Sequence, residues 1–505
     1  MSEKRNGRKP NILLLMTDQQ RFDTLGCYGC QAIETPNLDR LASEGVLFEN
    51  CYINATLCTP SRASLLTGKP VPGHGVYRLH DNLPRDEVLI GKHLQERGYR
   101  TALIGKLHVS GRVTEAEERH PNDGFDVYEW CLDPAIHLDS KYNSYASWLK
   151  DNHPAFLKKL LAGKRDVLHH PVEAHFNHWA ADRTISFLEE HAGGPQQDRP
   201  FFCFMSILDP HSPYFDHPAE YAEAVDRTKL PDVVALDQNS GPVPKDLQRE
   251  REYFFSKKKS EPYTREEILD IRHGYHASIA YLDFEFGRVL SALEKQGLAD
   301  NTLVIFTSDH GDMIGDHGLI MKGAFFYDPC TRVPLIMRYP GSIAAGTREQ
   351  GLVQLHDLAA TILASAGFEA EQLEPIMPDA VNLLPPLREG SGEFRDHAVC
   401  LYRNSGYGRA ADGTGSRYHE PPINATMFRA ERYKLNLYHD VSPAGTLEGE
   451  LYDLELDRLE TRNLWNDPAL AETKAELIAR ALNWIVANDS RYSGSRGGWK
   501  GPWQN

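Results

Sequence analysis

Apolar runs alternate with helically spaced segments along most of the chain. Residues 11–17 (NILLLMT) form a continuous apolar run, as in a strand buried on both faces. Similar runs predict strands at 46–52, 101–105, 201–208, 303–308 and 333–338, and helical spacing predicts helices at 36–45, 61–66, 89–97, 180–191 and 268–296. This alternation favours an α/β fold, with a large, mostly parallel sheet sandwiched by helices.

The pattern changes near residue 390. Strand-like segments at 398–403, 426–438 and 450–455 follow one another without helices, and a single helix is predicted at 469–488. Because 505 residues exceed what one hydrophobic core usually organises, we expect two domains, the larger of which covers 1–390. Residues 391–505 then form a smaller α+β domain, an antiparallel sheet plus a helix, with an extended tail.

The charge of the chain restricts its partners. The formal net charge is −16, so the surface repels nucleic acid and anionic lipid, and an anionic substrate would need locally concentrated positive charge. The chain contains no run of about 18 apolar residues, so the sequence predicts no membrane span. The apolar stretch at 12–16 is too short for a signal-peptide core, which predicts a cytoplasmic protein.

Eight cysteines are scattered along the chain, and they give no reason to expect a disulfide framework. Cys27 and Cys30 form a C-x-x-C pair, which could indicate redox or zinc chemistry. No second C-x-x-C follows, so two structural thiols are the favoured interpretation.

The pentapeptide at 58–62 (CTPSR), followed by ASLLTG at 63–68, carries the strongest chemical signal. Cys58 precedes a predicted helix with Pro60 in its first turn, so it feels the positive end of the helix dipole. Arg62 adds a fixed cation one turn later, and both favour an anionic substrate. The alternative is a buried cysteine near a helix cap.

This segment closely resembles the hallmark of the sulfatase family, within the alkaline phosphatase superfamily. The resemblance implies that a separate maturation enzyme oxidises Cys58 to formylglycine, whose hydrated aldehyde attacks the sulfur of a sulfate ester. It also implies that Arg62 stabilises this nucleophile. Similarity to the family continues through the end of the chain, in ERYKL at 431–435 and ELYDLELDRLETRNL at 450–464.

Two acidic strand ends predict a metal site. Asp18-Gln19 and Asp309-His310 each follow a predicted strand, and ligands of open α/β sheets bind at such ends. With Cys58 they match the metal site of the family, so the resemblance implies a divalent metal. Gln19 and His310 are similar to a subset that includes phosphonate monoester hydrolases. Calcium is expected, and manganese is the alternative because the site has fewer charged ligands.

Further site residues follow from the resemblance. In GYRTALIGKLH at 98–108, Lys106 would bind the sulfate and His108 would contact the aldehyde hydrate. His211 would contact the leaving-group oxygen as a general acid, and Lys322 would be a second cation on the sulfate. Asn82 and His175 are weaker candidates for substrate contact, and each is more simply a polar loop residue.

The sequence therefore predicts a sulfatase that acts on a small-molecule sulfate ester. The alternative is a phosphonate monoester or phosphate diester hydrolase with the same nucleophile, since one oxyanion site can process several esters. A non-catalytic anion- or metal-binding protein would lack a catalytic residue, and each expected residue is present.

Two further segments have separate interpretations. Residues 210–262 are interpreted as a long excursion, a lid or an oligomer contact, and the tail from Ser493 as a segment that reaches a neighbour in a homo-oligomer.

Overall fold

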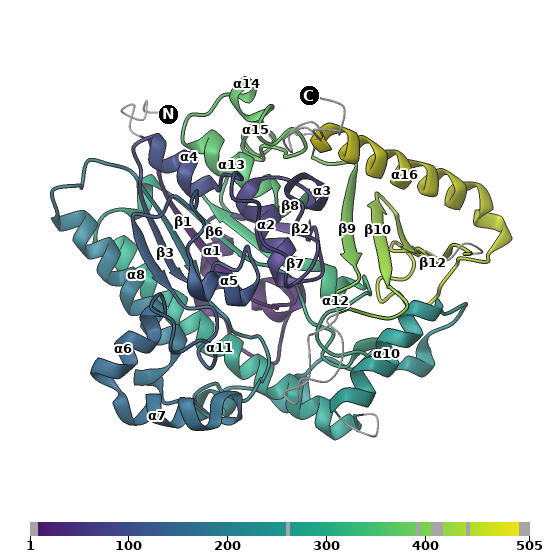
Figure 1. The fold of residues 1–505 in the computed structure, drawn as a ribbon, viewed down its shortest axis with the longest axis horizontal. Helices are drawn as coiled ribbons and strands as arrows, with labels where there is room; N and C mark the ends of the chain where they lie inside the picture. Colours follow the sequence, from purple (N-terminus) through teal and green to yellow (C-terminus); the bar gives the residue numbers. More distant parts are fainter. Residues whose placement is uncertain (1–8, 259–262, 390–393, 406–417, 441–444, 494–505) are drawn as a thin grey trace, which may run out of the picture.

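A large sheet organises the protein in its computed structural model, which describes residues 9–258, 263–389, 394–405, 418–440 and 445–493. Its eight strands lie in the order β4-β3-β5-β1-β6-β7-β2-β8. Figure 1 shows this sheet with helices packed around it. Only β7 runs antiparallel to its neighbours, so the mostly parallel sheet is confirmed. The strands are β1 (Asn11–Thr17), β2 (Val46–Tyr52), β3 (Arg100–Gly105), β4 (Val127–Trp130), β5 (Phe201–Ser206), β6 (Thr302–Ser308), β7 (Arg332–Arg338) and β8 (Thr347–Gln354).

Helices cover both faces of this sheet, so its central strands are buried along their whole length. One group consists of α1 (Pro36–Ser43), α8 (Phe176–Gly193) and α11 (Arg265–Lys295), in which α1 and α8 each pack against α11. The other consists of α2 (Cys58–Thr67), α4 (Ile90–Glu96) and α13 (Asp357–Ser365). The predicted helices are confirmed, although α8 begins at Phe176, before the predicted start at residue 180.

A second, antiparallel sheet of four strands lies in the C-terminal region (Figure 1). It contains β9 (His397–Arg403), β10 (Asn424–Ala430), β11 (Tyr433–Tyr438) and β12 (Glu448–Asp453), and α16 (Ala471–Ser493) packs on β10 and β11. The prediction of one strand over 426–438 was wrong, because the chain turns at Glu431 and Arg432 and pairs β10 with β11 as a hairpin. The boundary between residues 390 and 391 stays a prediction.

The segment at 210–262 is more regular than its sequence suggested. It contains α9 (Ala219–Ala222) and α10 (Lys245–Lys258), whose many charged residues hide the helical period. Residues 259–262, and 494–505 of the predicted tail, lie outside the described residues. The remaining helices are α3 (Val71–His74), α5 (Arg112–Glu117), α6 (Ser144–Asn152), α7 (Pro154–Gly163), α12 (Asp328–Thr331), α14 (Ala370–Leu373) and α15 (Leu384–Glu389). None of the helices in the described ranges is long and apolar enough to cross a bilayer.

All eight cysteines are free thiols. Burial raises the pKa of both Cys27 and Cys30, and Asp39 raises that of Cys27 further. A low pKa marks a reactive or metal-binding cysteine, so the raised pKa values favour the interpretation of this pair as structural thiols.

Buried histidines make stability depend on pH. Burial lowers the pKa of His170, His276 and His317 to about 4 in the folded chain, against about 6.5 in an unfolded one. Between these values the unfolded state binds more protons, so stability is complete above pH 6.5 and falls as the pH drops towards 4. We expect a loss on the order of 2 kcal/mol per histidine between pH 7 and pH 5.

Urea unfolding at pH 7 and pH 5 measures this loss. His276→Gln, which removes a fully buried titrating ring, should flatten the pH dependence between these values. An unchanged slope in this variant would show that His276 is not one of the responsible groups.

Candidate active site

The site lies where four neighbouring strands end. β3, β5, β1 and β6 are adjacent and parallel, so their carboxyl ends meet at one edge of the sheet. Thr17 of β1 pairs with Ser308 of β6, which brings the next residues, Asp18 and Asp309, side by side. Residues nearly 300 positions apart are thereby placed together.

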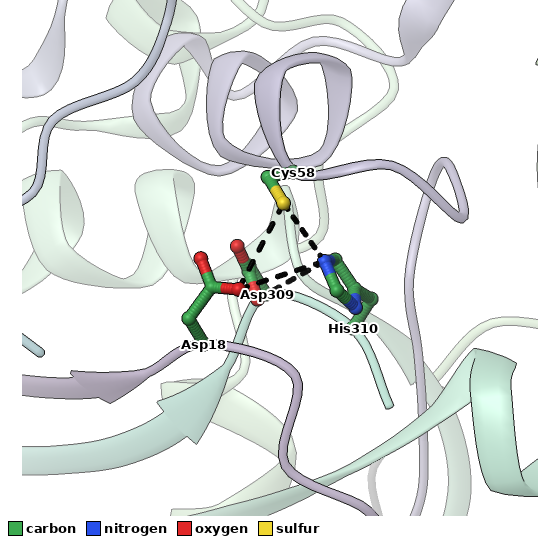
Figure 2. Close-up of side chains that lie close together, drawn as sticks. All are labelled: Asp18, Cys58, Asp309 and His310. Carbon is green, nitrogen blue, oxygen red and sulfur yellow. Dashed lines mark hydrogen bonds and ion pairs between the residues drawn. The ribbon is translucent and has the colours of Figure 1, made fainter. Parts of the chain in front are cut away.

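Four buried side chains converge at this edge (Figure 2). One ligand atom each of Asp18, Cys58, Asp309 and His310 lies within 4.8 Å of the others, and Cys58 Sγ is 3.0 Å from His310 Nε2. Cys58 is the first residue of the buried helix α2, so it enters the cluster from above the strand ends. Two carboxylates, an imidazole and a small side chain at this spacing fit a divalent cation.

Gln19, also predicted as a metal ligand, directs its side chain elsewhere. Its amide oxygen accepts a hydrogen bond from Lys322, and its amide nitrogen donates to Asp312 and lies 3.4 Å from the Tyr214 hydroxyl. Only its backbone N–H contacts a member of the cluster, the Asp309 carboxylate, at 3.1 Å. Gln19 therefore bridges the cluster to Lys322, and metal binding by its side chain stays a prediction.

Arg62 lies behind the cluster. Its fully buried guanidinium donates to Asp309 Oδ2 at 2.7 Å and to Asp18 Oδ2 at 3.0 Å, and it also bonds Ser206 Oγ and the Lys106 carbonyl. These contacts hold two carboxylates that would otherwise repel each other. Arg62 therefore fixes the two carboxylates beside Cys58, and its stabilisation of the nucleophile stays a prediction.

Nearby cations favour the ionised forms of Cys58 and Asp18. Burial and Asp18 would raise the pKa of the Cys58 thiol, but Lys106, Lys322 and His310 hold it below its usual value. Burial also opposes ionisation of Asp18, yet Lys106 Nζ, 2.6 Å from its carboxylate, and Arg62 keep its pKa well below the usual range. The site is built to stabilise negative charge despite the acidic surface of the chain.

His108 is held as a neutral base. Burial, reinforced by Lys106 and Arg62, lowers its pKa well below the usual value. The Thr59 hydroxyl donates to the Leu79 carbonyl and so accepts from His108 Nε2 at 3.1 Å. The ring proton therefore sits on Nε2, and Nδ1 is a buried acceptor without a partner among the described residues.

His211 and Lys322 form a pair. His211 Nδ1 donates to the Ser212 carbonyl at 2.8 Å, and its Nε2 accepts from Lys322 Nζ at 2.8 Å. Burial and Lys322 lower the pKa of His211 well below its usual value. Lys322 is thus the donor in this contact, and the role of His211 as a general acid stays a prediction.

A cavity of about 210 Å³ opens beside these groups. Cys58, Lys106, His108, His211 and Lys322 all line it, which brings the predicted nucleophile, bases and cations to one space. The remaining lining residues are Leu79, His80, Arg112, Leu132, Asp133, Ile136, Arg165, Leu208 and Met321. Such a concave site with converging polar groups suits a small anionic ester.

Two family models match the chain. The model described as "Sulfatase" matches residues 10–368, and the one described as "N-sulphoglucosamine sulphohydrolase, C-terminal" matches residues 315–486. The chain belongs to the sulfatase family. A member of this family is a sulfuric ester hydrolase.

Relatives of this sulfatase match over most of their length. The arylsulfatase of Clostridium perfringens is 30% identical over 409 residues, or 77% of this chain and 80% of that protein. The iduronate 2-sulfatase of Mus musculus is 30% identical over 541 residues, covering 90% and 91%. The crystal structure of the phosphonate monoester hydrolase of Agrobacterium radiobacter superposes with a TM-score of 0.75 at 25% identity, over 95% of this chain and 96% of that one.

Two weaker candidates have structural roles in the sulfatase. Asn82 is exposed and accepts a hydrogen bond from the Gly111 N–H at 3.1 Å, which joins two loops. His175 caps helix α8, where its ring accepts from the Asn177 N–H at 3.1 Å. The simpler interpretation, a polar loop residue, therefore fits both better than the predicted substrate contact.

Asp312, which the sequence analysis missed, fixes the segment before Lys322. Its carboxylate accepts from the Tyr214 hydroxyl at 2.7 Å and from the backbone N–H of Ile314 and Met321. The acid in the stretch DHGD at 309–312 could have indicated it, but only the fold shows what it contacts.

Glu115, a second missed residue, fixes the loop that carries His108. Its buried carboxylate accepts from the backbone N–H of His108 at 2.9 Å, Val109 at 2.6 Å and Ser110 at 3.1 Å, and from Trp130 Nε1 at 3.2 Å. His108 has a φ of 57°, a left-handed conformation that costs energy outside glycine. Glu115 is therefore a positioning residue for His108.

We expect Glu115→Gln to lower kcat/KM of the sulfatase about 10- to 100-fold, because the new amide N–H₂ would face backbone donors and displace His108. Steady-state kinetics should be measured below the variant's unfolding temperature. Glu117→Gln, an exposed change on the same helix, is the matched control. If Glu115→Gln lowered only the melting temperature and left the pH profile of kcat unchanged, the role of Glu115 would be purely structural. That result would contradict its role in positioning His108.

Proposed function

We propose that this chain hydrolyses a small-molecule sulfate ester with a formylglycine nucleophile derived from Cys58 and a divalent metal ion. The observation that carries the proposal is the position of Cys58: it begins a buried helix and lies within 4.8 Å of Asp18, Asp309 and His310, beside a cationic cavity. Membership of the sulfatase family supports the same reaction.

Different side chains of the site would bind the metal, bind the sulfate and position the metal ligands. Asp18, Asp309 and His310 would hold the metal, which supplies Lewis-acid catalysis beside the attacking oxygen of the hydrated aldehyde. Lys106 and Lys322 line the cavity as ammonium groups and would bind the oxygens of the sulfate. Arg62 keeps the two carboxylates together, so the ligands are in place before substrate binds.

Proton transfer would fall to His108 and to the His211–Lys322 pair. Neutral His108, with Nδ1 as its free acceptor, is suited to take a proton when the sulfated intermediate collapses. The leaving-group oxygen would take a proton from the His211–Lys322 pair, in which Lys322 Nζ already donates along the 2.8 Å contact. The two proton transfers therefore use different residues.

A divalent metal should stabilise the protein. We expect Ca²⁺, and to a smaller extent Mn²⁺, to raise the melting temperature after treatment with a chelator, because binding to the folded state alone adds stability. A saturating concentration of about 100 Kd contributes about 2.7 kcal/mol. Asp309→Asn should abolish the shift, whereas Asp126→Asn, a change at a half-exposed carboxylate away from the site, should not. A shift that persists in Asp309→Asn would place the metal elsewhere.

Activity should follow the modification of Cys58. The test is to express the chain with a formylglycine-generating maturation enzyme, measure by mass spectrometry the converted fraction of the Cys58 peptide, and assay hydrolysis of an aryl sulfate. The rate should rise in proportion to the converted fraction and vanish without conversion. Full conversion without release of sulfate from metal-loaded protein would overturn the proposed function.

A phosphonate monoester hydrolase is the second candidate. The overall likeness to the enzyme of Agrobacterium radiobacter favours it, as do Gln19 and His310 at the second positions of the two strand-end motifs. The closing experiment of the Discussion compares the two esters directly.

A cytoplasmic location and a homo-oligomeric assembly complete the proposal. The two tryptophans in the polar tail from Ser493 support the assembly. Light scattering of the full chain and of a variant truncated after Ser493 tests the assembly; equal masses would contradict the role of the tail.

A further inference from the structure

Two arginines line the catalytic cavity in addition to the lysines assigned to the sulfate. Arg112 is the first residue of α5, and Arg165 lies in the short helical turn Lys164–Asp166. Both contribute to the same cavity wall as Cys58 and Lys106. This concentration of positive charge contrasts with the net charge of −16 on the whole chain.

Arg165 is held in place by an acid. Its guanidinium donates to the buried carboxylate of Asp133, which in turn accepts from the Ala135 N–H at 2.8 Å. A planar guanidinium keeps further donors available when one edge is paired. Asp133 therefore orients Arg165 at the cavity without using all of its hydrogen-bonding capacity.

Arg112 is not neutralised. It is exposed, and it forms no ion pair within the part of the chain that the structure describes. Among the residues that line the cavity, Arg112, Arg165 and Asp133 leave one surplus positive charge beyond Lys106 and Lys322. A sulfate ester carries one negative charge on its sulfate, and Lys106, Lys322 and the metal are already assigned to that group.

We propose that the alcohol part of the substrate carries a second anionic group, a carboxylate or a further sulfate, which Arg112 and Arg165 bind. The guanidinium fork suits the paired oxygens of either group. Leu79, Leu132 and Ile136 line the same cavity and give the carbon skeleton between the two anions an apolar surface. A cavity of about 210 Å³ restricts that skeleton to roughly one ring.

This inference rests on the proposed function, and the test separates the two. The probes are three aryl sulfates with the same ring: one with a carboxylate, one with a sulfonate that represents a further sulfate, and one with the methyl ester of the carboxylate. The matured, metal-loaded full chain is compared with Arg112→Met, Arg165→Lys and the control Arg85→Met, an exposed arginine paired with Glu118 at 3.0 Å. The measured quantity is the ratio of kcat/KM for each anionic probe to that for the ester, which cancels general losses of activity.

We expect Arg112→Met to lower this ratio about tenfold or more, with the change mainly in KM, and Arg85→Met to leave it unchanged. Arg165→Lys should lower it less, since a lysine keeps the charge and loses the fork. The larger effect on the carboxylate or on the sulfonate identifies which anion is bound. Equal ratios in wild type and Arg112→Met would overturn the inference while ester hydrolysis still supports the proposed function; no hydrolysis of any probe would overturn the proposed function itself.

Discussion

Cys58→Ala abolishes turnover of an aryl sulfate if the account of the site is correct. The variant retains the metal-ligand carboxylates and the cationic cavity but offers no thiol for conversion, and removing a covalent nucleophile lowers kcat by roughly 10⁴-fold or more. Steady-state rates with inorganic sulfate as the measured product give the comparison.

Cys51→Ala is the matched control, because Cys51 is equally buried, in β2, and is not among the cavity-lining residues. Cys51→Ala should lower the free energy of unfolding and change the turnover rate little. If Cys58→Ala kept more than a small fraction of the wild-type rate, water activated directly by the metal would be the nucleophile, and formylglycine would have no role.

Arg62→Met should destabilise the metal-free protein by about 3–5 kcal/mol, because it leaves two buried carboxylates without their shared cation. Arg62, Asp18 and Asp309 are all essentially inaccessible to solvent, so water cannot replace the lost ion pairs. Urea unfolding in the presence of a chelator measures the loss.

An exposed ion pair provides the comparison for Arg62. Arg227 contacts Asp270 at 2.7 Å with about half of each side chain exposed, and Arg227→Met should cost no more than about 1 kcal/mol. Added Ca²⁺ should recover part of the stability of Arg62→Met, because the metal restores positive charge between the carboxylates. A loss as small as that of Arg227→Met would show that Arg62 does not hold the carboxylates.

The sequence predicted the central sheet well because its strands are buried on both faces and read as continuous apolar runs. β1 was predicted at its observed bounds for this reason. β8 escaped detection because its first half is exposed and polar, TREQG, so only Leu352 and Val353 carry an apolar signal. β10 and β11 were predicted as one strand over 426–438, because strand-like residues flank the two-residue turn of the hairpin on both sides.

The residues of the site were predicted through motifs, and their contacts were not. Asp18, Cys58, Asp309 and His310 converge as expected, since parallel strands must end at a common edge. The direction of a side chain depends on partners far away in the sequence. Arg62 therefore turned out to face carboxylates, and Gln19 to face Lys322.

The arginines of the cavity wall illustrate the same limit. Arg112 and Arg165 stand in polar stretches with no periodic or motif signal, and only the fold brings them to the cavity that Cys58 lines. Positive charge near the active site was predictable from the acidic net charge, whereas its position was not.

The central claim is tested most directly by comparing kcat/KM for an aryl sulfate and an aryl phosphonate monoester with the same leaving group, on matured and metal-loaded protein. The account predicts a clear preference for the sulfate, absent in Cys58→Ala. A preference for the phosphonate would contradict it, and would mean that Gln19, His310 and the likeness to the phosphonate hydrolase of Agrobacterium radiobacter identify the reaction.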